Sequence, residues 1–299
     1  MGRRHTGQDG HRPLRTAALT SFLAVGVVGA LTAAGLLAAH PRHPGRPSSD
    51  TVALAVPTTA APTPTPSSSP SPSPSPSSSA SLAPEGVPLG VTTTAPDDAE
   101  SRRVGALFSG QATPGNHFCT ASVIDSPGRN LILTAAHCLS GANGTTFAPG
   151  YRDGRAPYGS WRVTKVYTAD GWRNGGDPDE DFAILAVAPN DGRQIEDAVG
   201  GNLLGTDAPW TARVRLYGYP ASTELPIRCT NTTTRQDTYQ RRIDCPAFPG
   251  GTSGGPFVDT DTGEVIGVIG GYQQGGDTAD TSYSAAFDHT IAELLAEAS

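Results

Sequence analysis

The pattern of apolar and polar residues divides the chain into stretches of different character. No charged residue occurs from Thr16 to Ala39, a stretch rich in Leu and Val. From about Val56 to Pro84 nearly every residue is Pro, Ser, Thr or Ala. From about Arg102 onward, short runs of Val, Ile, Leu and aromatic residues alternate with Gly, Pro, Asn and Asp. The pattern therefore predicts a segment able to span a bilayer, a spacer without side chains for a core, and a folded domain rich in strands.

The predicted organisation has four parts: a basic start at residues 1–15, a signal peptide or transmembrane anchor at 16–39, a disordered linker rich in Pro, Ser and Thr at 40–100, and a folded domain at 101–299. The four arginines of the first part favour a cytoplasmic start and an exported remainder. The small-residue cleavage candidate Ala53-Leu54-Ala55 lies well beyond the apolar run, which favours a retained anchor over a cleaved signal peptide. We therefore expect the folded domain outside the cell, either secreted or anchored to the membrane.

The folded domain is predicted to consist of many short strands and one helix. Strands are expected near Val104–Phe108, Phe118–Ile124, Leu131–Ala135, Trp161–Tyr167, Phe182–Val187, Val214–Tyr219, Pro256–Val258, Val265–Gly270 and Ser282–Ala286. Asp288 is suited to cap a short terminal helix in which Ile291, Leu294 and Leu295 share one apolar face. Short strands with a single terminal helix predict an all-β sandwich or barrel rather than alternating α/β units.

Charge and cysteine content narrow the class of protein. The chain holds 28 acidic and 21 basic residues, and the acidic excess lies after Glu100, so no nucleic-acid partner is expected. The four cysteines form two neighbouring pairs, Cys119 with Cys138 and Cys229 with Cys245. An even number of cysteines in an exported domain predicts disulfides. Three connectivities are open to the sequence, and pairing within each neighbouring pair closes the shortest loops.

A serine set among glycines is the strongest candidate for chemistry. In the stretch 250–256, Ser253 is flanked by glycines that permit a tight turn and close approach by another molecule. The backbone amides of Gly251 and Ser253 can point together at a developing oxyanion. An ordinary glycine-rich loop has the same composition, so this motif needs partners elsewhere in the chain.

Two residues are suited to be those partners. His137 directly follows an apolar strand and precedes Cys138, a cysteine able to tie the loop back to Cys119. Asp181 immediately precedes the apolar run from Phe182, whose burial would draw the carboxylate inward. A buried carboxylate requires a partner, and an imidazole N–H is a suitable one because the bond fixes the tautomer of the ring. Each residue taken alone is as well explained by a structural role.

Together, and in this order, the three motifs resemble the chymotrypsin-like (trypsin-fold) serine proteases. The matching stretches are Thr134–Cys138, Asp181–Leu185 and Gly251–Pro256, and the resemblance covers about 102–299. It implies two antiparallel six-stranded β-barrels with the active site between them and a C-terminal helix. It also implies a serine endopeptidase that acts through an acyl-enzyme, without a metal or other cofactor, on a polypeptide partner. We expect a monomer.

The resemblance assigns roles to particular residues of this chain. Ser253 would be the nucleophile, His137 the general base and Asp181 the orienting carboxylate, with Gly251 and Ser253 as the oxyanion hole. It also implies a disulfide between Cys119 and Cys138. The substrate would pair as an added strand with the main chain of Val268-Ile269-Gly270-Gly271, where Gly270 and Gly271 leave the path of the peptide open.

Two departures from the family concern activation and specificity. Thr252 stands where animal relatives carry an aspartate that binds a freed N-terminus, so cutting after Arg102-Arg103 is not expected to be an absolute switch. In this respect the chain resembles the bacterial glutamyl-endopeptidase-like branch, with Cys229–Cys245 as a local disulfide beside the specificity pocket. Ala247 stands where trypsin-like relatives keep a pocket aspartate, and Ile269 where glutamate-specific relatives carry a histidine. The expected substrate residue before the cut is therefore small to medium and uncharged.

Three alternatives compete with this interpretation. An α/β-hydrolase esterase needs its acid and histidine after the serine, where only His289 occurs. A zinc site can be drawn from His117, Cys119, His137 and Cys138, but paired Cys-x-x-Cys spacing is absent and exported thiols would oxidise. The alternative that stays open is an inactive protease-like domain that binds a peptide or a cell-surface partner.

Overall fold

The computed structural model describes residues 87–139 and 141–299. The basic start, the apolar segment 16–39 and most of the linker predicted for 40–100 lie outside the described residues. Within the described ranges, every helix is too short or too polar to cross a bilayer.

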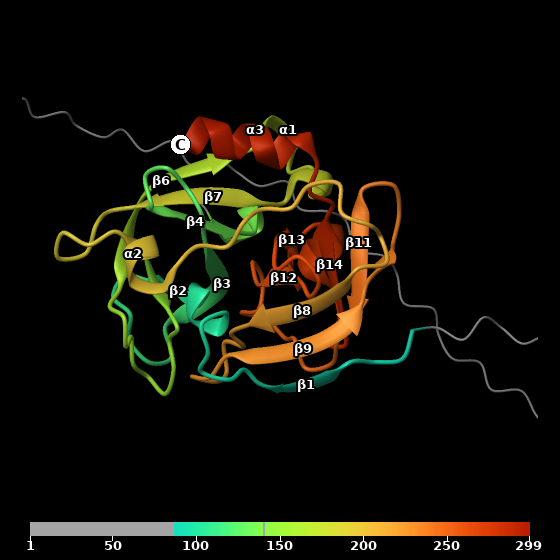
Figure 1. Ribbon diagram of the computed structural model, residues 1–299, viewed down its shortest axis with the longest axis horizontal. Helices are drawn as coiled ribbons and strands as arrows, with labels where there is room; N and C mark the ends of the chain where they lie inside the picture. Colours follow the sequence, from blue (N-terminus) through green and yellow to red (C-terminus); the bar gives the residue numbers. More distant parts are fainter. Residues whose placement is uncertain (1–86, 140) are drawn as a thin grey trace, which may run out of the picture. The chain divides into compact units, whose positions relative to one another are not determined.

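The first half of the folded unit is a closed six-stranded barrel, as predicted (Figure 1). Its strands follow one another around the barrel in the order β2, β3, β4, β7, β6 and β5, and all neighbours are antiparallel. The bounds are β2 (Val104–Ser109), β3 (His117–Ile124), β4 (Leu131–Thr134), β5 (Thr145–Pro149), β6 (Trp161–Thr168) and β7 (Ala183–Val187).

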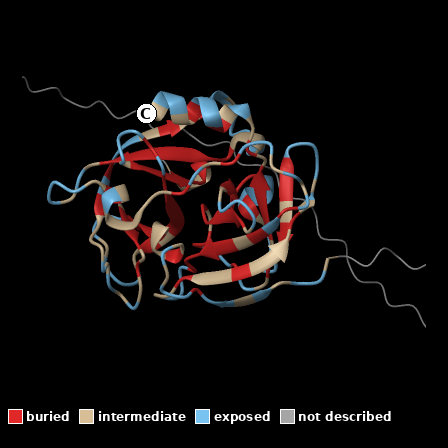
Figure 2. Cartoon of the chain, in the orientation of Figure 1, coloured by how far each residue is buried: buried red, intermediate tan, exposed pale blue. Residues whose placement is uncertain are grey.

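Strands β2, β4 and β7 of this barrel are apolar along nearly their whole length because both of their faces are buried (Figure 2). Along β2, Leu107 belongs to the barrel interior, while its neighbours Ala106 and Phe108 belong to the core shared with the second half. Successive side chains of a strand point to opposite faces, so a strand between two cores needs a continuous apolar run.

The second half holds two sheets. The five-stranded sheet has the order β1-β9-β8-β12-β13, and the three-stranded sheet has the order β10-β11-β14. The bounds are β1 (Val91–Thr94), β8 (Arg213–Gly218), β9 (Ile227–Thr232), β10 (Thr234–Arg235), β11 (Gln240–Asp244), β12 (Pro256–Asp259), β13 (Val265–Val268) and β14 (Thr281–Ala285). The predicted second six-stranded barrel is thus not shown.

Side-chain hydrogen bonds connect the two sheets at points where they meet. Between β13 and β14, the amide of Val268 donates to the hydroxyl of Ser284 at 3.0 Å instead of to a backbone carbonyl. Between β9 and β11, the side-chain amide of Asn231 donates to the carbonyl of Asp244 at 2.7 Å. A continuous ladder needs backbone partners on both strands, whereas each of these two bonds uses a side chain on one of them.

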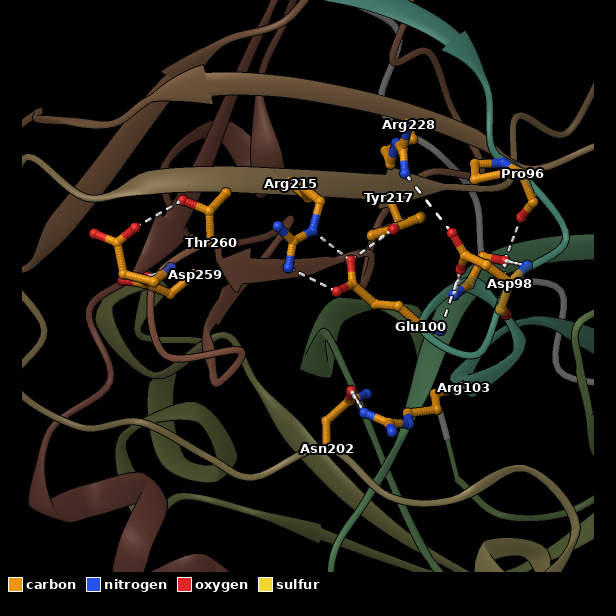
Figure 3. Close-up of polar contacts among 12 residues, drawn as sticks. Pro96, Asp98, Glu100, Arg103, Asn202, Arg215, Tyr217, Arg228, Asp259 and Thr260 are labelled. Carbon is orange, nitrogen blue, oxygen red and sulfur yellow. Dashed lines mark hydrogen bonds and ion pairs between the residues drawn. The ribbon is translucent and has the colours of Figure 1, made fainter.

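The folded unit begins earlier than the predicted boundary at residue 101. Strand β1, which falls in the predicted linker, pairs with β9 in the register Val91 to Thr230. Further on, Glu100 accepts hydrogen bonds from both Nε and Nη2 of Arg215, at 2.6 and 2.7 Å, and from the hydroxyl of Tyr217 at 2.6 Å (Figure 3). A bidentate guanidinium–carboxylate pair that is partly shielded from water is one of the stronger polar contacts, so this segment is part of the fold.

The dibasic pair Arg102-Arg103 lies inside this anchored segment. It belongs to the 3-10 helix η1 (Ser101–Arg103), Arg102 pairs with Asp97 at 2.7 Å, and Arg103 donates to Asn202 at 3.3 Å. A protease binds its substrate as an extended strand, so this helical turn would have to unwind before it could be cut.

The helices are short and lie at the surface. They are α1 (Asp170–Gly175), α2 (Ile195–Val199) and the terminal α3 (His289–Ala298), with further 3-10 turns η2 (Ala136–Cys138), η3 (Pro178–Glu180) and η4 (Tyr272–Gly275). As predicted, Asp288 caps α3 by accepting from the amide of Thr290 at 2.8 Å. Ile291 and Leu294 are buried, and α3 lies over β6 and β7 with its outer face exposed (Figure 2).

Both neighbouring cysteine pairs form disulfides, Cys119 with Cys138 and Cys229 with Cys245. The sequence separations are 19 and 16 residues, so each bridge closes a short loop. Restricting the unfolded chain in this way contributes about 3 kcal/mol per loop. The first bridge joins β3 to the turn that carries His137, and the second joins β9 to the end of β11.

A carboxyl pair at the base of α2 makes stability depend on pH. Burial, together with a hydrogen bond to the carboxyl group of Asp125, raises the pKa of Glu196 to about 7 from its ordinary value of 4.5, against the opposing effects of the Ser126 amide and Arg129. The folded state therefore holds this proton more tightly than the unfolded state. Stability from this group is complete below about pH 4.5 and is lost as pH rises through about 7.

We expect Glu196→Gln to stabilise the protein at pH 8 and to leave it unchanged at pH 4. Each pKa unit corresponds to about 1.4 kcal/mol, but Glu196 is partly exposed, so solvent screening reduces the expected gain to about 1–2 kcal/mol. Denaturant unfolding at both pH values measures it. Glu297→Gln, on the exposed face of α3, is the control and should change neither value. An equal gain for Glu196→Gln at both pH values would rule out titration of this pair as the cause.

Candidate active site

The structure brings His137 and Asp181 together. The Nδ1 atom of His137 lies 2.7 Å from Oδ2 of Asp181, and the backbone amide of His137 donates to Oδ1 at 2.9 Å. The Asp181 side chain is fully buried, and only 12% of the His137 side chain is exposed. A carboxylate so placed requires Nδ1 to carry a proton, which leaves Nε2 free to accept one.

Local structure at the ends of two neighbouring strands positions this pair. His137 lies in η2, three residues after the end of β4 at Thr134, and Cys138 ties that turn to β3. Asp181 follows η3, which Asp177 caps by accepting from the amide of Asp179 at 3.0 Å. Because β4 and β7 pair directly, with Thr134 opposite Ala183, the residues beyond those ends meet.

The loop that carries Ser253 is bonded to the same region of the first barrel. The carbonyl of Ser253 accepts from the amide of Thr120 at 2.8 Å, and Thr120 follows Cys119 of the disulfide beside His137. The sulfur atoms of Cys119 and Cys138 lie within 4.8 Å of a ring nitrogen of His137. Ser253 is partly exposed, and among the described residues its hydroxyl makes no hydrogen bond.

The same loop presents two free backbone amides. The carbonyl of Gly250 accepts from the amide of Ala221 at 2.9 Å, and a planar trans peptide then turns the amide of Gly251 the opposite way. Within the described ranges, the amides of Gly251 and Ser253 have no acceptor. Gly251 has φ of +96°, and an added Cβ would lie 2.7 Å from the carbonyl of Tyr219, so only glycine fits. The two unpaired amides, one on the serine itself and one two residues before it, form an anion-binding geometry.

The profile of the trypsin-like peptidase domain matches residues 119–268, half of the chain, a range that holds His137, Asp181 and Ser253. The chain belongs to the trypsin-like peptidase family. Solved serine proteases share this fold. The thermostable serine protease AL20 from an extremophilic microorganism is 25% identical, with a TM-score of 0.59 over 68% of this chain and 99% of the other. Protease Anisep from Arthrobacter nicotinovorans is 24% identical, with the same TM-score over 70% and 99%. A Glu endopeptidase is 20% identical, with a TM-score of 0.55 over 69% and 95%.

A curated relative carries a different name. The extracellular metalloprotease of Bacillus subtilis (strain 168) is 24% identical over 152 residues, 46% of this chain, and the match spans about half of that relative, 47% of its length. In the described part of the peptidase, the group of potential metal ligands that lie close together is Cys119, His137 and Cys138. The two cysteines are joined to each other, which leaves one ligand, so these residues do not fit a metal ion.

A cavity of about 280 Å³ opens beside Ser253. The buried side chains of Phe248 and Ile269 contribute apolar lining. Gln274, within η4, and Asp277, just after η4, also line the cavity. Asp277 is its one charged lining residue in the described structure, is exposed, and accepts from the side-chain amide of Gln273 at 2.5 Å. Of the predicted pocket residues, Ile269 lines the cavity. Ala247 is exposed and does not line it; its neighbour Phe248 does.

The predicted peptide-binding edge is shorter than expected. Strand β13 ends at Val268, and the amides that follow donate within the protein: Ile269 to Gly255 at 2.9 Å, Gly270 to Tyr283 at 3.0 Å, and Gly271 to Asp181 Oδ2 at 2.8 Å. Among the described residues, the carbonyl of Gly270 has no donor. This carbonyl is the group on the edge that is open to a peptide N–H.

Sequence reasoning missed two polar residues that connect the halves at this site. Gln240 donates to the carbonyl of Pro178 at 2.9 Å and to Asp179 at 2.7 Å, and it accepts from the amide of Tyr272 at 2.9 Å. It therefore ties the turn before Asp181 to the edge beside the cavity. The other residue is Thr120, which is fully buried in β3. A single polar residue in a strand gives no local signal of a long-range bond, so neither could be found from the pattern.

Proposed function

We propose that the protein is an exported serine endopeptidase that cleaves polypeptides through an acyl-enzyme, with Ser253, His137 and Asp181 as its triad. The observation that carries the proposal is the buried Asp181 carboxylate held 2.7 Å from Nδ1 of His137, next to a loop whose Gly251 and Ser253 amides are unpaired. These are the parts that acyl transfer requires: an oriented base and preorganised donors beside a hydroxyl.

In the proposed reaction, the Oγ atom of Ser253 attacks the carbonyl carbon of the scissile bond while its proton passes to Nε2 of His137. The oxyanion is bound by the amides of Gly251 and Ser253, and Asp181 stabilises the imidazolium. His137 then gives the proton to the leaving amine as the C–N bond breaks, which leaves an acyl-enzyme. Water then attacks the ester carbonyl while its proton passes to His137; the C–Oγ bond breaks, His137 returns the proton to Oγ of Ser253, and the acid product leaves.

The lining of the cavity supports an uncharged residue before the cut. A basic side chain would lie against Phe248 and Ile269 and would meet only the exposed carboxylate of Asp277, which solvent screens, whereas an acidic side chain would be repelled by that carboxylate. Profiling of a peptide library tests this preference, and strong selection for a charged residue at that position would contradict it.

The proposal that the enzyme is exported, as a secreted or membrane-anchored protein, is supported by the N-terminal sequence and by the two disulfides, because disulfides form in oxidising compartments. Sequencing the N-terminus of the exported protein would show whether the anchor is kept.

Labelling by a fluorophosphonate tests the catalytic proposal. The intact protein should take up one equivalent of label, and mass spectrometry should locate it on Ser253. Ser253→Ala should fold, as judged by circular dichroism, yet take up no label and lose peptide hydrolysis. An inactive peptide-binding domain would bind peptides equally well with either residue and would stay unlabelled.

A further inference from the structure

Thr120, a residue of the first barrel, is bonded to the nucleophile loop of the second half on both sides of Thr252. Its hydroxyl donates to the carbonyl of Gly251 at 3.0 Å, and its amide donates to the carbonyl of Ser253 at 2.8 Å. The side chain is fully buried, so these bonds do not compete with water.

The Thr120 hydroxyl is held in place from a third direction. It accepts from the amide of Tyr219 at 2.8 Å, in the same segment whose Ala221 amide binds the carbonyl of Gly250 at 2.9 Å. The Thr120 carbonyl accepts from the hydroxyl of Thr134 at 2.7 Å, at the end of the strand that leads to His137. Thr120 thus has every polar group paired, and its hydroxyl proton is directed at Gly251 because the oxygen already accepts from Tyr219.

These bonds fix the peptide planes on either side of Gly251. The Gly250 carbonyl is held by Ala221 and the Gly251 carbonyl by Thr120, so the amide of Gly251 cannot rotate out of the oxyanion site without breaking one of them. The loop has no charged residue to hold it. Thr252, which precedes the nucleophile, instead donates its hydroxyl to the carbonyl of Pro249 at 2.7 Å.

We propose that Thr120 is a positioning residue for catalysis: its buried hydroxyl holds Gly251 so that the oxyanion hole is formed without an ion pair from a cleaved N-terminus. The proposal rests on the proposed serine endopeptidase function. If Thr120 has this role, loss of its neutral hydroxyl weakens stabilisation of the transition state more than it weakens substrate binding.

Replacement of Thr120 by valine keeps the branched shape and removes the hydroxyl, leaving the Tyr219 amide and the Gly251 carbonyl unpaired. We expect kcat on a chromogenic peptide to fall about 10- to 100-fold. This decrease is smaller than the one caused by removing an oxyanion donor, because the amide of Gly251 is still present but is held less firmly. KM should change less than about threefold. The inhibition constant of a peptide aldehyde, which forms a tetrahedral adduct with Ser253, should rise by the same factor as kcat falls. Thr120→Ser should restore both.

Thr233→Val is the matched control, since it also removes a fully buried threonine hydroxyl, one that bonds Trp210, Ala212 and Arg241 rather than Thr120 or the nucleophile loop. It should lower thermal stability about as much as Thr120→Val and leave the aldehyde inhibition constant unchanged. If valine is not accommodated at position 120, Thr120→Ala removes the same hydroxyl. A Thr120 variant that loses stability but keeps kcat and aldehyde binding well below its melting temperature would overturn the proposal. Failure of the parent protein itself to hydrolyse peptides or accept the fluorophosphonate would instead refute the proposed function.

Discussion

Replacement of Asp181 by asparagine is expected to lower kcat by about four orders of magnitude at neutral pH while the protein stays folded. The reason lies in the three N–H groups that donate hydrogen bonds to the Asp181 carboxylate. His137 donates from its backbone to Oδ1, and both His137 Nδ1 and the Gly271 amide lie within 2.8 Å of Oδ2. Asparagine offers one acceptor oxygen and one NH2 group, so it cannot satisfy all three.

Either orientation of the asparagine is unfavourable. With its NH2 at the position of Oδ2, it faces Nδ1 of His137, drives the proton to Nε2 and removes the base; it also opposes the Gly271 amide. With its NH2 at the position of Oδ1, it opposes the backbone amide of His137, and the positive charge formed on the ring during attack loses its counter-charge. Steady-state kinetics with a chromogenic peptide measure the loss.

The control for Asp181→Asn is Asp261→Asn, in the exposed turn between β12 and β13, which should keep parental kcat and KM. Because Asp181 orients the base and does not touch the substrate, KM should change little in either variant. Parental activity in Asp181→Asn would show that the His137–Asp181 contact has no part in the chemistry.

Five of the six strands of the first barrel could be predicted because their pattern is decided locally, whereas the short strand β5 (Thr145–Pro149) was not predicted. Runs such as Leu131–Thr134 and Ala183–Val187 are buried on both faces, and an unbroken apolar run between turn residues indicates that environment. The meeting of His137 and Asp181 follows from the same logic, since both residues stand beside apolar strands that pair with each other.

The strands of the second half were harder to predict because tertiary bonds override their polar sequences. Strand β11 reads Gln-Arg-Arg-Ile-Asp, yet Arg241 is buried there. Its guanidinium donates to the carbonyls of Pro209 and Ala208 at 2.6 and 3.0 Å, and burial lowers its pKa to about 10. No periodic pattern indicates a strand whose charged side chain is satisfied by carbonyls 30 residues away.

The substrate edge shows the same limit within the site. Sequence alone placed a peptide along Val268–Gly271, but the amides of Gly270 and Gly271 are taken by Tyr283 and by Asp181. Those acceptors come from strands and turns far apart in the sequence. A motif can therefore identify which residues gather at the site, whereas the direction of each backbone N–H depends on the assembled fold.

Gly254 is where we expect a single added methyl group to cost most. Its φ is +80°, and an added Cβ would overlap the Thr134 hydroxyl oxygen and the Thr120 carbonyl, with the Ala135 amide at 3.0 Å. Gly254→Ala is therefore expected to lose about 1–2 kcal/mol of unfolding free energy to the left-handed backbone and about 1–3 kcal/mol more to overpacking. The obstructing carbonyl belongs to the residue that holds Gly251, so relief of the overlap would also move the nucleophile loop.

Gly263→Ala separates these two costs. Gly263 has almost the same backbone, with φ of +76°, but an added Cβ meets nothing within 4 Å. Gly263→Ala should lose about 1–2 kcal/mol of unfolding free energy and keep parental kcat, while Gly254→Ala loses about 2–5 kcal/mol and, where still folded, most of its kcat. Urea unfolding and steady-state kinetics on both variants provide the comparison. Equal losses of stability would mean that the space beside Gly254 is wider than the structure shows, and that the contact between the nucleophile loop and the strands leading to His137 is loose rather than close-packed.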